Sequence, residues 1–360
     1  KNNEKKYFHN TFFYFFLVFY LYLVFISFFS ESAYFSLKSS VVYFRFGIFS
    51  LAVWYLLDKN KNFINNFFFI FLITFFIALL NGYYQFFNGN GIFGIQSLNP
   101  TRLTLLLNDR MLLGNYLSRL FPLLLALFIF RVSKYENYSI VLILFLSFIM
   151  MTTDILIYIS GERTGLGLMA IATLLLVILL SKFRKIRLIS VILSLIIIIG
   201  ITLTNREVKD RNITFTLNQM GLSQNEGSRS IYYLSQQHEA HIKSAFLMFK
   251  EAPLLGVGPN MFRKYCSNEK FKVSFNSCST HPHNIYIQLL SEAGILGSLF
   301  ILIVILYVSY QIIVKFKEKI YGNTNKFSDY QICLLICFLL TLFPFLPSLN
   351  FFNNWINIIY

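Results

Sequence analysis

The first long apolar stretch of the chain lies at residues 11–30 and reads TFFYFFLVFYLYLVFISFFS. A helix needs about 20 apolar residues to cross the hydrocarbon core of a bilayer, so this stretch is long enough for one span. A signal-peptide core is usually about 7–15 residues long, and we therefore interpret the stretch as a retained helix. The chain starts at Lys1 rather than Met, which indicates a processed or cut N-terminus.

Apolar runs of this kind recur along the whole chain. Eight more are found at residues 41–57, 63–80, 111–130, 139–160, 164–180, 188–204, 285–314 and 329–345. A tenth begins near Phe351 and stops at Tyr360, which indicates a truncated span. The 360 residues are 56% hydrophobic and only 13% charged, whereas soluble domains carry about 25% charged residues. This composition excludes a soluble enzyme, a disordered linker and a nucleic-acid module, and predicts an all-α polytopic membrane protein with about ten or more transmembrane helices.

The distribution of Lys and Arg predicts the orientation of these helices. With a cytoplasmic N-terminus, fifteen Lys and Arg fall in the inner segments, which are 1–10, 58–62, 131–138, 181–187 and 315–328. The short outer segments hold four, in 31–40, 81–110 and 161–163. Cytoplasmic loops carry the excess of basic residues in membrane proteins, so this orientation is favoured. The net charge of +15 then reflects sidedness and does not require a nucleic-acid partner.

This orientation divides the chain into three parts. Residues 1–204 hold helices 1–7, residues 205–283 form one large outer loop, and residues 284–360 hold helices 8–10. The loop is polar and carries ten Lys and Arg. A solvated linker is one interpretation, but the apolar residues at 231–234 and 245–249 have helical spacing, which predicts a folded and mostly helical loop.

The densest group of reactive side chains is found where this loop meets the eighth span, in the sequence CSTHPHNIY at 278–286. Asn284 is suited to cap the helix that follows, which places His283 at the membrane surface. An imidazole with an ordinary pKa near 6.5 accepts a proton from a hydroxyl at neutral pH. A single histidine here would most simply be an interfacial hydrogen-bonding residue, but His281 and His283 together, beside a folded loop, favour a functional site.

Two cysteines of the loop, Cys266 and Cys278, allow two interpretations. Together with His281 and His283 they could form a four-ligand zinc site, but their spacing does not match the usual Cys-x₂₋₄-Cys pattern. Two cysteines outside the cytoplasm more often pair with each other. We therefore prefer a structural disulfide and predict no metal.

Two arginines stand out in the membrane part of the chain. Arg163 lies in the sequence GERTG at 161–165, where the fifth span ends and the sixth begins. It is either an interfacial anchor or, through its planar fork, a ligand for a phosphate group. Arg119 lies within an apolar run, where an unpaired charge is costly, so it is also a functional candidate.

These residues resemble the O-antigen ligase and polymerase superfamily of bacterial envelope glycosyltransferases. The chain has His283-Asn284, then nine residues, then Gly294 and Gly297 three positions later, which is similar to the His-Asn/Ser/Gln-x₉-Gly-x-x-Gly pattern of the ligases. The resemblance extends over roughly residues 100 to 300 and includes the segment 161–166 with Arg163, and Arg229 followed by APLLGVG at 252–258. Ser298-Leu299 depart from the pattern, since many ligases carry Thr or Tyr there.

The resemblance implies a C-type glycosyltransferase architecture, in which the outer loop is periplasmic and the protein lies in the bacterial inner membrane. The donor would be a glycan on undecaprenyl diphosphate, and the reaction would need no metal and no other cofactor. The acceptor would be the lipid A core in a ligase or a second lipid-linked repeat in a polymerase. Ligation is our preferred expectation, with membrane lipids and these glycans as the partners.

The resemblance also implies roles for particular residues. His283 and Arg163 are the expected catalytic residues, with His283 acting on the acceptor hydroxyl and Arg163 on the diphosphate charge. The expected substrate-binding residues are Arg229, Arg263, Arg119, His281, Asn284 and Tyr286. A transporter of lipid-linked glycans and a partner-binding receptor remain alternatives from other classes. Inverted repeats, the usual mark of transporters, are not visible in the sequence.

Overall fold

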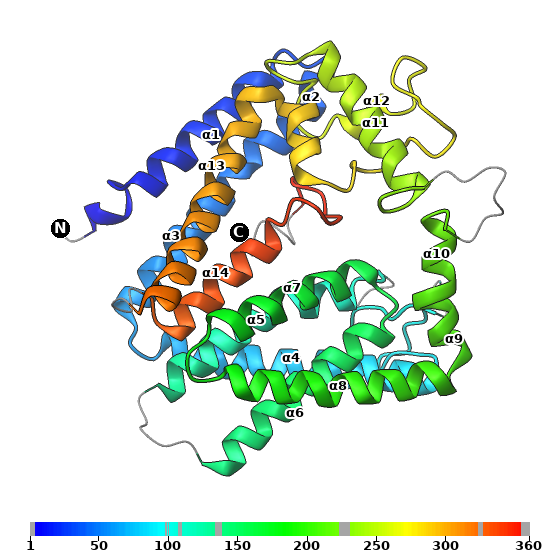
Figure 1. Cartoon of the computed structure of the whole chain (residues 1–360). Coiled ribbons are helices and arrows are strands. Elements are labelled where there is room, and N and C mark those ends of the chain that lie inside the picture. Colours follow the sequence, from blue (N-terminus) through cyan, green and yellow to red (C-terminus); the bar gives the residue numbers. More distant parts are fainter. Residues whose placement is uncertain are drawn as a thin grey trace. The chain divides into compact units, whose positions relative to one another are not determined.

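The computed structural model describes residues 4–97, 99, 101–106, 110–133, 139–222, 231–322 and 327–353. All regular elements in these ranges are helices, and no strand occurs among them (Figure 1). The described residues cluster into two compact units. One takes its residues from 1–63, 219–307 and 341–360, and the other from 64–218 and 308–340. The predicted loop segment 205–283 therefore divides between the units after residue 218.

The first unit begins with an apolar helix that packs on another helix far along the chain. Its elements are η1 (Lys5–Tyr7), α1 (Thr11–Ser27), α2 (Ala33–Ser40), η2 (Val41–Tyr43), α3 (Phe44–Lys59), α11 (Gln236–Glu251), α12 (Phe262–Tyr265) and the first part of α13 (Ile285–Tyr321). The ring of Phe300 in α13 lies 5.0 Å, centroid to centroid, from that of Phe19 in α1. Tyr22 in α1 donates a hydrogen bond of 2.6 Å to the carbonyl of Ala293. These contacts hold α1 and α13 side by side, as Figure 1 shows.

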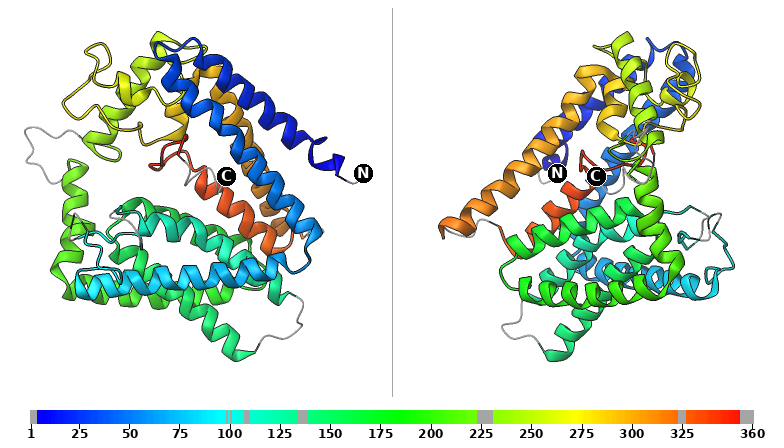
Figure 2. Two further views of the ribbon diagram at one scale, coloured as in Figure 1. Left: turned by 180° about the vertical axis from the view of Figure 1, so that it is seen from behind. Right: turned by 45° about the vertical axis from the view of Figure 1, so that its right-hand side comes forward.

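The second unit is a helical bundle built around α5. Its elements are α4 (Phe63–Asn88), α5 (Leu113–Val132), α6 (Ile140–Ile159), α7 (Arg163–Leu179), α8 (Arg184–Thr204), α9 (Arg206–Lys209), the π-helical turn η3 (Asp210–Thr214), α10 (Phe215–Gln219), the end of α13 and α14 (Asp329–Thr341). Figure 2 shows the helices of this bundle lying alongside one another. Two glycines allow α5 and α7 to approach closely, since a Cβ on Gly165 would lie only 2.6 Å from the carbonyl carbon of Gly114.

A buried ion pair within the bundle joins α6 to α8. Arg187 donates two hydrogen bonds to the carboxylate of Asp154, at 2.8 and 2.9 Å, and its side chain is fully buried. Ser194 donates a third to the same carboxylate at 3.1 Å. A charge at such a depth needs a partner because desolvation is costly. The sequence analysis did not single out this pair, since its members lie in different apolar or flanking segments.

The structure confirms a polytopic helical membrane protein, but it supports fewer spans by length than the ten expected. Among the described residues, six helical stretches are long and apolar enough to cross a bilayer: 33–59, 63–88, 113–132, 140–159, 184–204 and 285–321. Three further predicted spans are shorter helices of 17, 17 and 13 residues, at α1, α7 and α14. At about 1.5 Å per residue, 17 residues reach roughly 25 Å, less than the hydrocarbon core of about 30 Å. The tenth run falls largely outside the described residues.

The outward faces of the long helices suit contact with lipid. On α8, Ile189, Ile196 and Leu203 are all exposed, with 56, 61 and 79% of their surface accessible. Such a row of large aliphatic side chains would be unfavourable in water, but it matches the hydrocarbon core of a bilayer. The exposed apolar rows are therefore consistent with the assignment of these helices as spans.

Candidate functional site

Two histidines missed by the sequence analysis lie on one face of α11. The helix starts after Ser235, whose hydroxyl accepts a hydrogen bond from the backbone N–H of His238 and also bonds to its Nδ1 at 2.7 Å. His241 follows three residues later, so the two imidazoles share a face of the helix. His238 is half-buried, whereas His241 is only 1% exposed.

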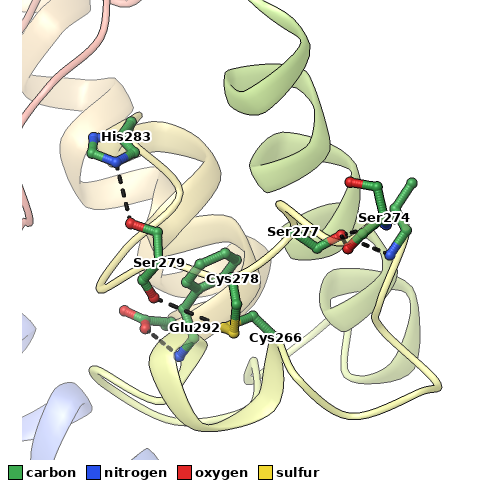
Figure 3. The surroundings of a disulfide bond; sticks show 9 residues. Cys266, Ser274, Ser277, Cys278, Ser279, His283 and Glu292 are labelled. Atoms are coloured by element: carbon green, nitrogen blue, oxygen red, sulfur yellow. Dashed lines mark hydrogen bonds between the residues drawn. A yellow bond between two sulfur atoms is a disulfide. The ribbon is translucent and has the colours of Figure 1, made fainter.

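The segment before α13 brings two more histidines to these rings. The ring of His283 lies 4.2 Å from that of His281 and 5.3 Å from those of His238 and His241, measured between centroids. His283 takes a positive φ of 57°, and Figure 3 shows its Nε2 facing the hydroxyl of Ser279, at 3.2 Å. Four of the five histidines of the chain thus form one group, which we call the histidine cluster.

Burial lowers the pKa of three members of the histidine cluster, His241, His281 and His283, and so favours their neutral state. Burial, followed by repulsion from His281, His238 and His241, lowers the pKa of His283 from 6.5 to about 3. Burial also lowers the pKa of His281 to about 4, against the opposing effect of its hydrogen bond to the Ser348 carbonyl, at 3.2 Å. A neutral imidazole has a lone pair available, so His283 can accept a proton or a hydrogen bond at neutral pH.

A disulfide lies next to the histidine cluster. Cys266 and Cys278 are bonded, with their Cα atoms 4.9 Å apart (Figure 3). Cys278 directly precedes Ser279, the hydrogen-bond partner of His283. The disulfide therefore links the end of α12 to the segment that carries the two adjacent histidines. Within the described ranges, no group of three or more His, Cys, Asp or Glu is arranged to hold a metal ion.

Two glycine motifs from the sequence analysis, Gly294 with Gly297 and the segment APLLGVG at 252–258, meet at a break in α13. Gly294 has φ 67° and ψ −170°, so the helix is interrupted there. The segment 253–258 bonds to the interruption through three backbone hydrogen bonds of 2.9 to 3.0 Å. The N–H of Ile295 donates to the carbonyl of Pro253. The N–H groups of Val257 and Gly258 donate to the carbonyls of Ser291 and Glu292, respectively. The break exposes backbone groups that would otherwise bond within the helix, and this segment satisfies them.

Asn284 and Tyr286 are engaged in holding the start of α13. The side-chain oxygen of Asn284 accepts hydrogen bonds from the backbone N–H groups of Tyr286 and Ile287, at 3.0 and 3.1 Å, and this is the cap expected from the sequence. Its amide donates to the carbonyl of Pro344 at 2.8 Å. The hydroxyl of Tyr286 donates to the carbonyl of Leu342. Both side chains thus tie α13 to the segment that follows α14.

A buried carboxylate connects α12 to α13 below the histidines. Glu292 accepts a hydrogen bond of 2.7 Å from the backbone N–H of Phe262 and one of 2.9 Å from the amide of Gln288. Figure 3 shows the Glu292 side chain beside the disulfide. Arg263, the residue after Phe262, is exposed, and its charge contributes to the lowered pKa of His281. The structure thus brings Arg263 into the surroundings of the histidine cluster.

The second unit carries a separate group of basic side chains at the start of α7. Glu162 precedes the helix and is buried, and its carboxylate accepts hydrogen bonds from Gly114 N–H and the amide of Asn115, at 2.9 and 2.8 Å. It therefore anchors the beginning of α5. Burial raises the pKa of Glu162 to about 7, although the charge of Arg102 and these hydrogen bonds oppose the rise. Arg163 is half-buried as the first residue of α7.

Arg102 and Arg211 join Arg163 in this group, which we call the arginine cluster. Arg211 donates from Nε to the carbonyl of Gly161 at 3.1 Å, and Arg102 donates from Nη2 to the carbonyl of Met111 at 2.9 Å. Burial, with repulsion from Arg102 and Arg163, lowers the pKa of Arg211 to about 10. Three like charges share this region, an arrangement suited to an anion. Neither Arg102 nor Arg211 was predicted, because nothing in the sequence separates them from the other basic residues of the polar segments.

The remaining predicted residues fall elsewhere. Arg119 is 4% exposed within the bundle of the second unit, and its Nη1 donates to the carbonyl of Leu340 in α14 at 2.8 Å. The structure thus gives Arg119 a contact between two helices. Arg229 lies outside the described residues.

The long apolar helices define the class of the protein, a multi-pass helical membrane protein. Residues 145–302 match the family model described as O-antigen ligase, and this match supports the resemblance to the O-antigen ligase superfamily. The matched segment contains Arg163, His283 and both glycine motifs. No curated protein and no solved structure matches the chain.

Proposed function

We propose that this protein is a membrane glycosyltransferase that moves a glycan from undecaprenyl diphosphate to an acceptor hydroxyl. The preferred reaction is ligation of O-antigen to the lipid A core on the periplasmic face of the inner membrane. The observation that carries this proposal is the O-antigen ligase match over residues 145–302. That match spans both the arginine-bearing segment and the histidine cluster.

In this proposal His283 acts on the acceptor. Its neutral ring accepts the proton of the acceptor hydroxyl while the oxygen bonds to the anomeric carbon of the donor sugar. A pKa of about 3 makes the free ring a weak base. The negative charge of a bound diphosphate would raise that pKa, since an opposite charge favours the protonated imidazole. His281 holds its own ring between Thr280 and the Ser348 carbonyl and so positions its neighbour.

The leaving group of the same reaction is a diphosphate, whose charge grows as the bond to the anomeric carbon breaks. Fixed cations stabilise such charge with little reorganisation. Arg163 is our main candidate for this role, with Arg229, Arg263 and Arg119 as further candidates. Asn284 and Tyr286 are candidates for sugar contacts, beside their contacts within the fold. We also propose that the three shorter helices cross the membrane, so that the segment 205–283 lies on the periplasmic side.

Complementation of a ligase-null host tests this function. Wild type, His283→Ala and Arg163→Ala are expressed at matched levels, with His9→Ala as a control, because His9 is exposed and outside the cluster. We expect polymer on lipid A with wild type and the control, and none with the other two variants. A ladder that persists in both variants would overturn the proposed site. The same four proteins in a polymerase-null host test the alternative, in which single repeats are extended to polymer.

A further inference from the structure

A cavity of about 210 Å³ with a mixed polar and apolar lining lies within the second unit. It is lined by the end of α4, the loop that follows it, the end of α6 and the segment from α9 to η3. The side chains that matter for its chemistry are Gln85, Ser97, Arg102, Asn205, Arg211 and Asn212. Arg163 is not among the lining residues in the described part of the chain, although its charge acts on Arg211, so this cavity lies beside the position that we assign to the diphosphate.

Two guanidinium groups give the cavity a positive charge. Arg102 uses Nη2 for the carbonyl of Met111, and its buried Nε has no hydrogen-bond partner among the described residues. Arg211 is held by the carbonyl of Gly161 and by the ring of Phe215, 4.8 Å from its guanidinium carbon. Each guanidinium has five donors, and these contacts occupy only some of them. An anion bound between the two arginines would satisfy the remaining donors.

The negative charges nearby do not neutralise this pair. Glu162 acts electrostatically on both arginines, but its oxygens are bound to Gly114 and Asn115 of α5. Glu207 also lines the cavity but is exposed, so solvent screens its charge. Burial, followed by repulsion from Arg102 and Arg163, lowers the pKa of Arg211, and a bound anion would relieve both effects. The cavity therefore has a net preference for an anionic ligand.

The other lining groups resemble those that bind sugars. Asn205 uses its oxygen to cap α9 at 3.0 Å, and Asn212 donates to the carbonyl of Tyr158 at 3.2 Å. Each amide has further donor or acceptor capacity, and Ser97 adds a hydroxyl. Phe86 adds an aromatic surface. A volume of about 210 Å³ is below the range of roughly 300–1,000 Å³ usual for larger ligands, so it suits one sugar unit.

We propose that this cavity binds a negatively charged sugar unit of the glycan, with Arg102 and Arg211 holding its carboxylate or phosphate group. The inference rests on the proposed transferase function and adds a substrate class to it, an acidic glycan. Neutral sugars are bound poorly at such a site, because they leave the two desolvated guanidinium groups without a counter-charge.

Ligand binding to the full chain in lipid nanodiscs tests this inference. The probes are D-glucuronate, glucose 6-phosphate, D-glucose and pyrophosphate. Saturation-transfer NMR detects binding of the three sugars, and competition against a bound sugar detects binding of pyrophosphate. We expect at least one charged sugar to bind about tenfold or more tightly than glucose, as a charge-assisted hydrogen bond predicts. Tighter binding of D-glucuronate would identify the anionic group as a carboxylate, and tighter binding of glucose 6-phosphate would identify it as a phosphate.

Matched variants locate the binding site. Arg102→Gln and Arg211→Gln should each remove the preference for the charged sugar. Arg206→Gln should not, because that side chain is 93% exposed on α9 and does not line the cavity among the described residues. Arg102→Lys and Arg211→Lys keep the charge, so they show whether a loss of binding reflects chemistry or misfolding. Equal binding of glucose and the charged sugars, or binding unchanged in both Gln variants, would overturn the inference.

Two further outcomes separate this inference from the function on which it rests. Pyrophosphate that displaces the charged sugar and binds more tightly, in a manner that needs Arg102 and Arg211, would reassign the cavity to the diphosphate and overturn the inference. His283→Ala should lose transfer and keep sugar binding. A wild type that binds the charged sugar but transfers no glycan would support the cavity while contradicting the proposed function.

Discussion

The imidazole rings of His283 and His241 lie 5.3 Å apart, although one belongs to α11 and the other to the segment that starts α13. His283 belongs to the motif shared with the ligases, whereas His241 has no such signal. Their proximity means that the protonation of one ring acts on the other. The neighbouring rings thus add to burial in keeping the candidate base neutral.

The first prediction concerns this coupling. His238→Gln and His241→Gln each remove a ring that repels a proton on His283, so each should raise the pKa of His283 from about 3 toward 6.5. Burial remains, so the rise is partial. Because the neutral ring is the active form, the acid limb of transfer activity should move to higher pH by the same amount. Imidazole ¹⁵N shifts in histidine-labelled protein measure the pKa directly, and only five histidines need assignment. An unchanged pKa in both variants would contradict the coupling.

The second prediction concerns the geometry of Arg163. Arg163→Ala should lower the rate of glycan transfer about 10²–10³-fold, the usual effect of removing one donor that stabilises transition-state charge. Arg163→Lys should recover little of this, since an ammonium lacks the planar fork that binds two phosphate oxygens. Single-turnover transfer rates compare the two with Arg206→Lys, an exposed control. Full activity of the Lys variant would show that charge alone suffices.

The third prediction concerns the break in α13. Gly294→Ala should destabilise the first unit, because a Cβ there would lie 2.2 Å from the carbonyl oxygen of Leu254 and the φ of 67° disfavours a side chain. Strain of this kind costs about 1–3 kcal/mol. Gly200→Ala in α8 is the matched control, since nothing lies within 4 Å of its added Cβ. Thermal unfolding in detergent should show a lower Tm for the first variant only, and equal Tm values would argue against strain at the break.

The fourth prediction concerns the disulfide. Replacement of both Cys266 and Cys278 by Ser opens a short loop, which should cost about 3 kcal/mol by loop entropy. We expect faster proteolysis within the segment 266–278 and weaker transfer, because Ser279 and His283 lose their anchor. Dithiothreitol should reproduce the effect on wild type and leave the double variant unchanged. If reduced wild type shows neither faster proteolysis nor weaker transfer, the disulfide does not support the histidine cluster.

Much of the fold could be predicted from hydrophobic length and capping alone. The apolar runs predicted the helices because a backbone in lipid must satisfy its own hydrogen bonds, and Asn284 predicted the start of α13 through its side-chain oxygen. The spacing of Gly294 and Gly297 from His283 indicated the resemblance to the O-antigen ligases. The break in α13 was not predicted, since the same glycines also suit close packing of an unbroken helix.

The partners of the candidate residues were decided by tertiary structure. His238 and His241 reach His283 only because α11 packs beside the segment that precedes α13. Arg102 and Arg211 line one cavity although they come from segments far apart in sequence. Contacts of this kind depend on how helices pack, and a single sequence carries no pattern for them. The sequence by itself predicted the helical membrane class, the resemblance to the O-antigen ligases and His283 as the candidate base. Only folding formed the histidine cluster in the first unit and the arginine-lined cavity in the second, because charge and burial act through space and not along the chain.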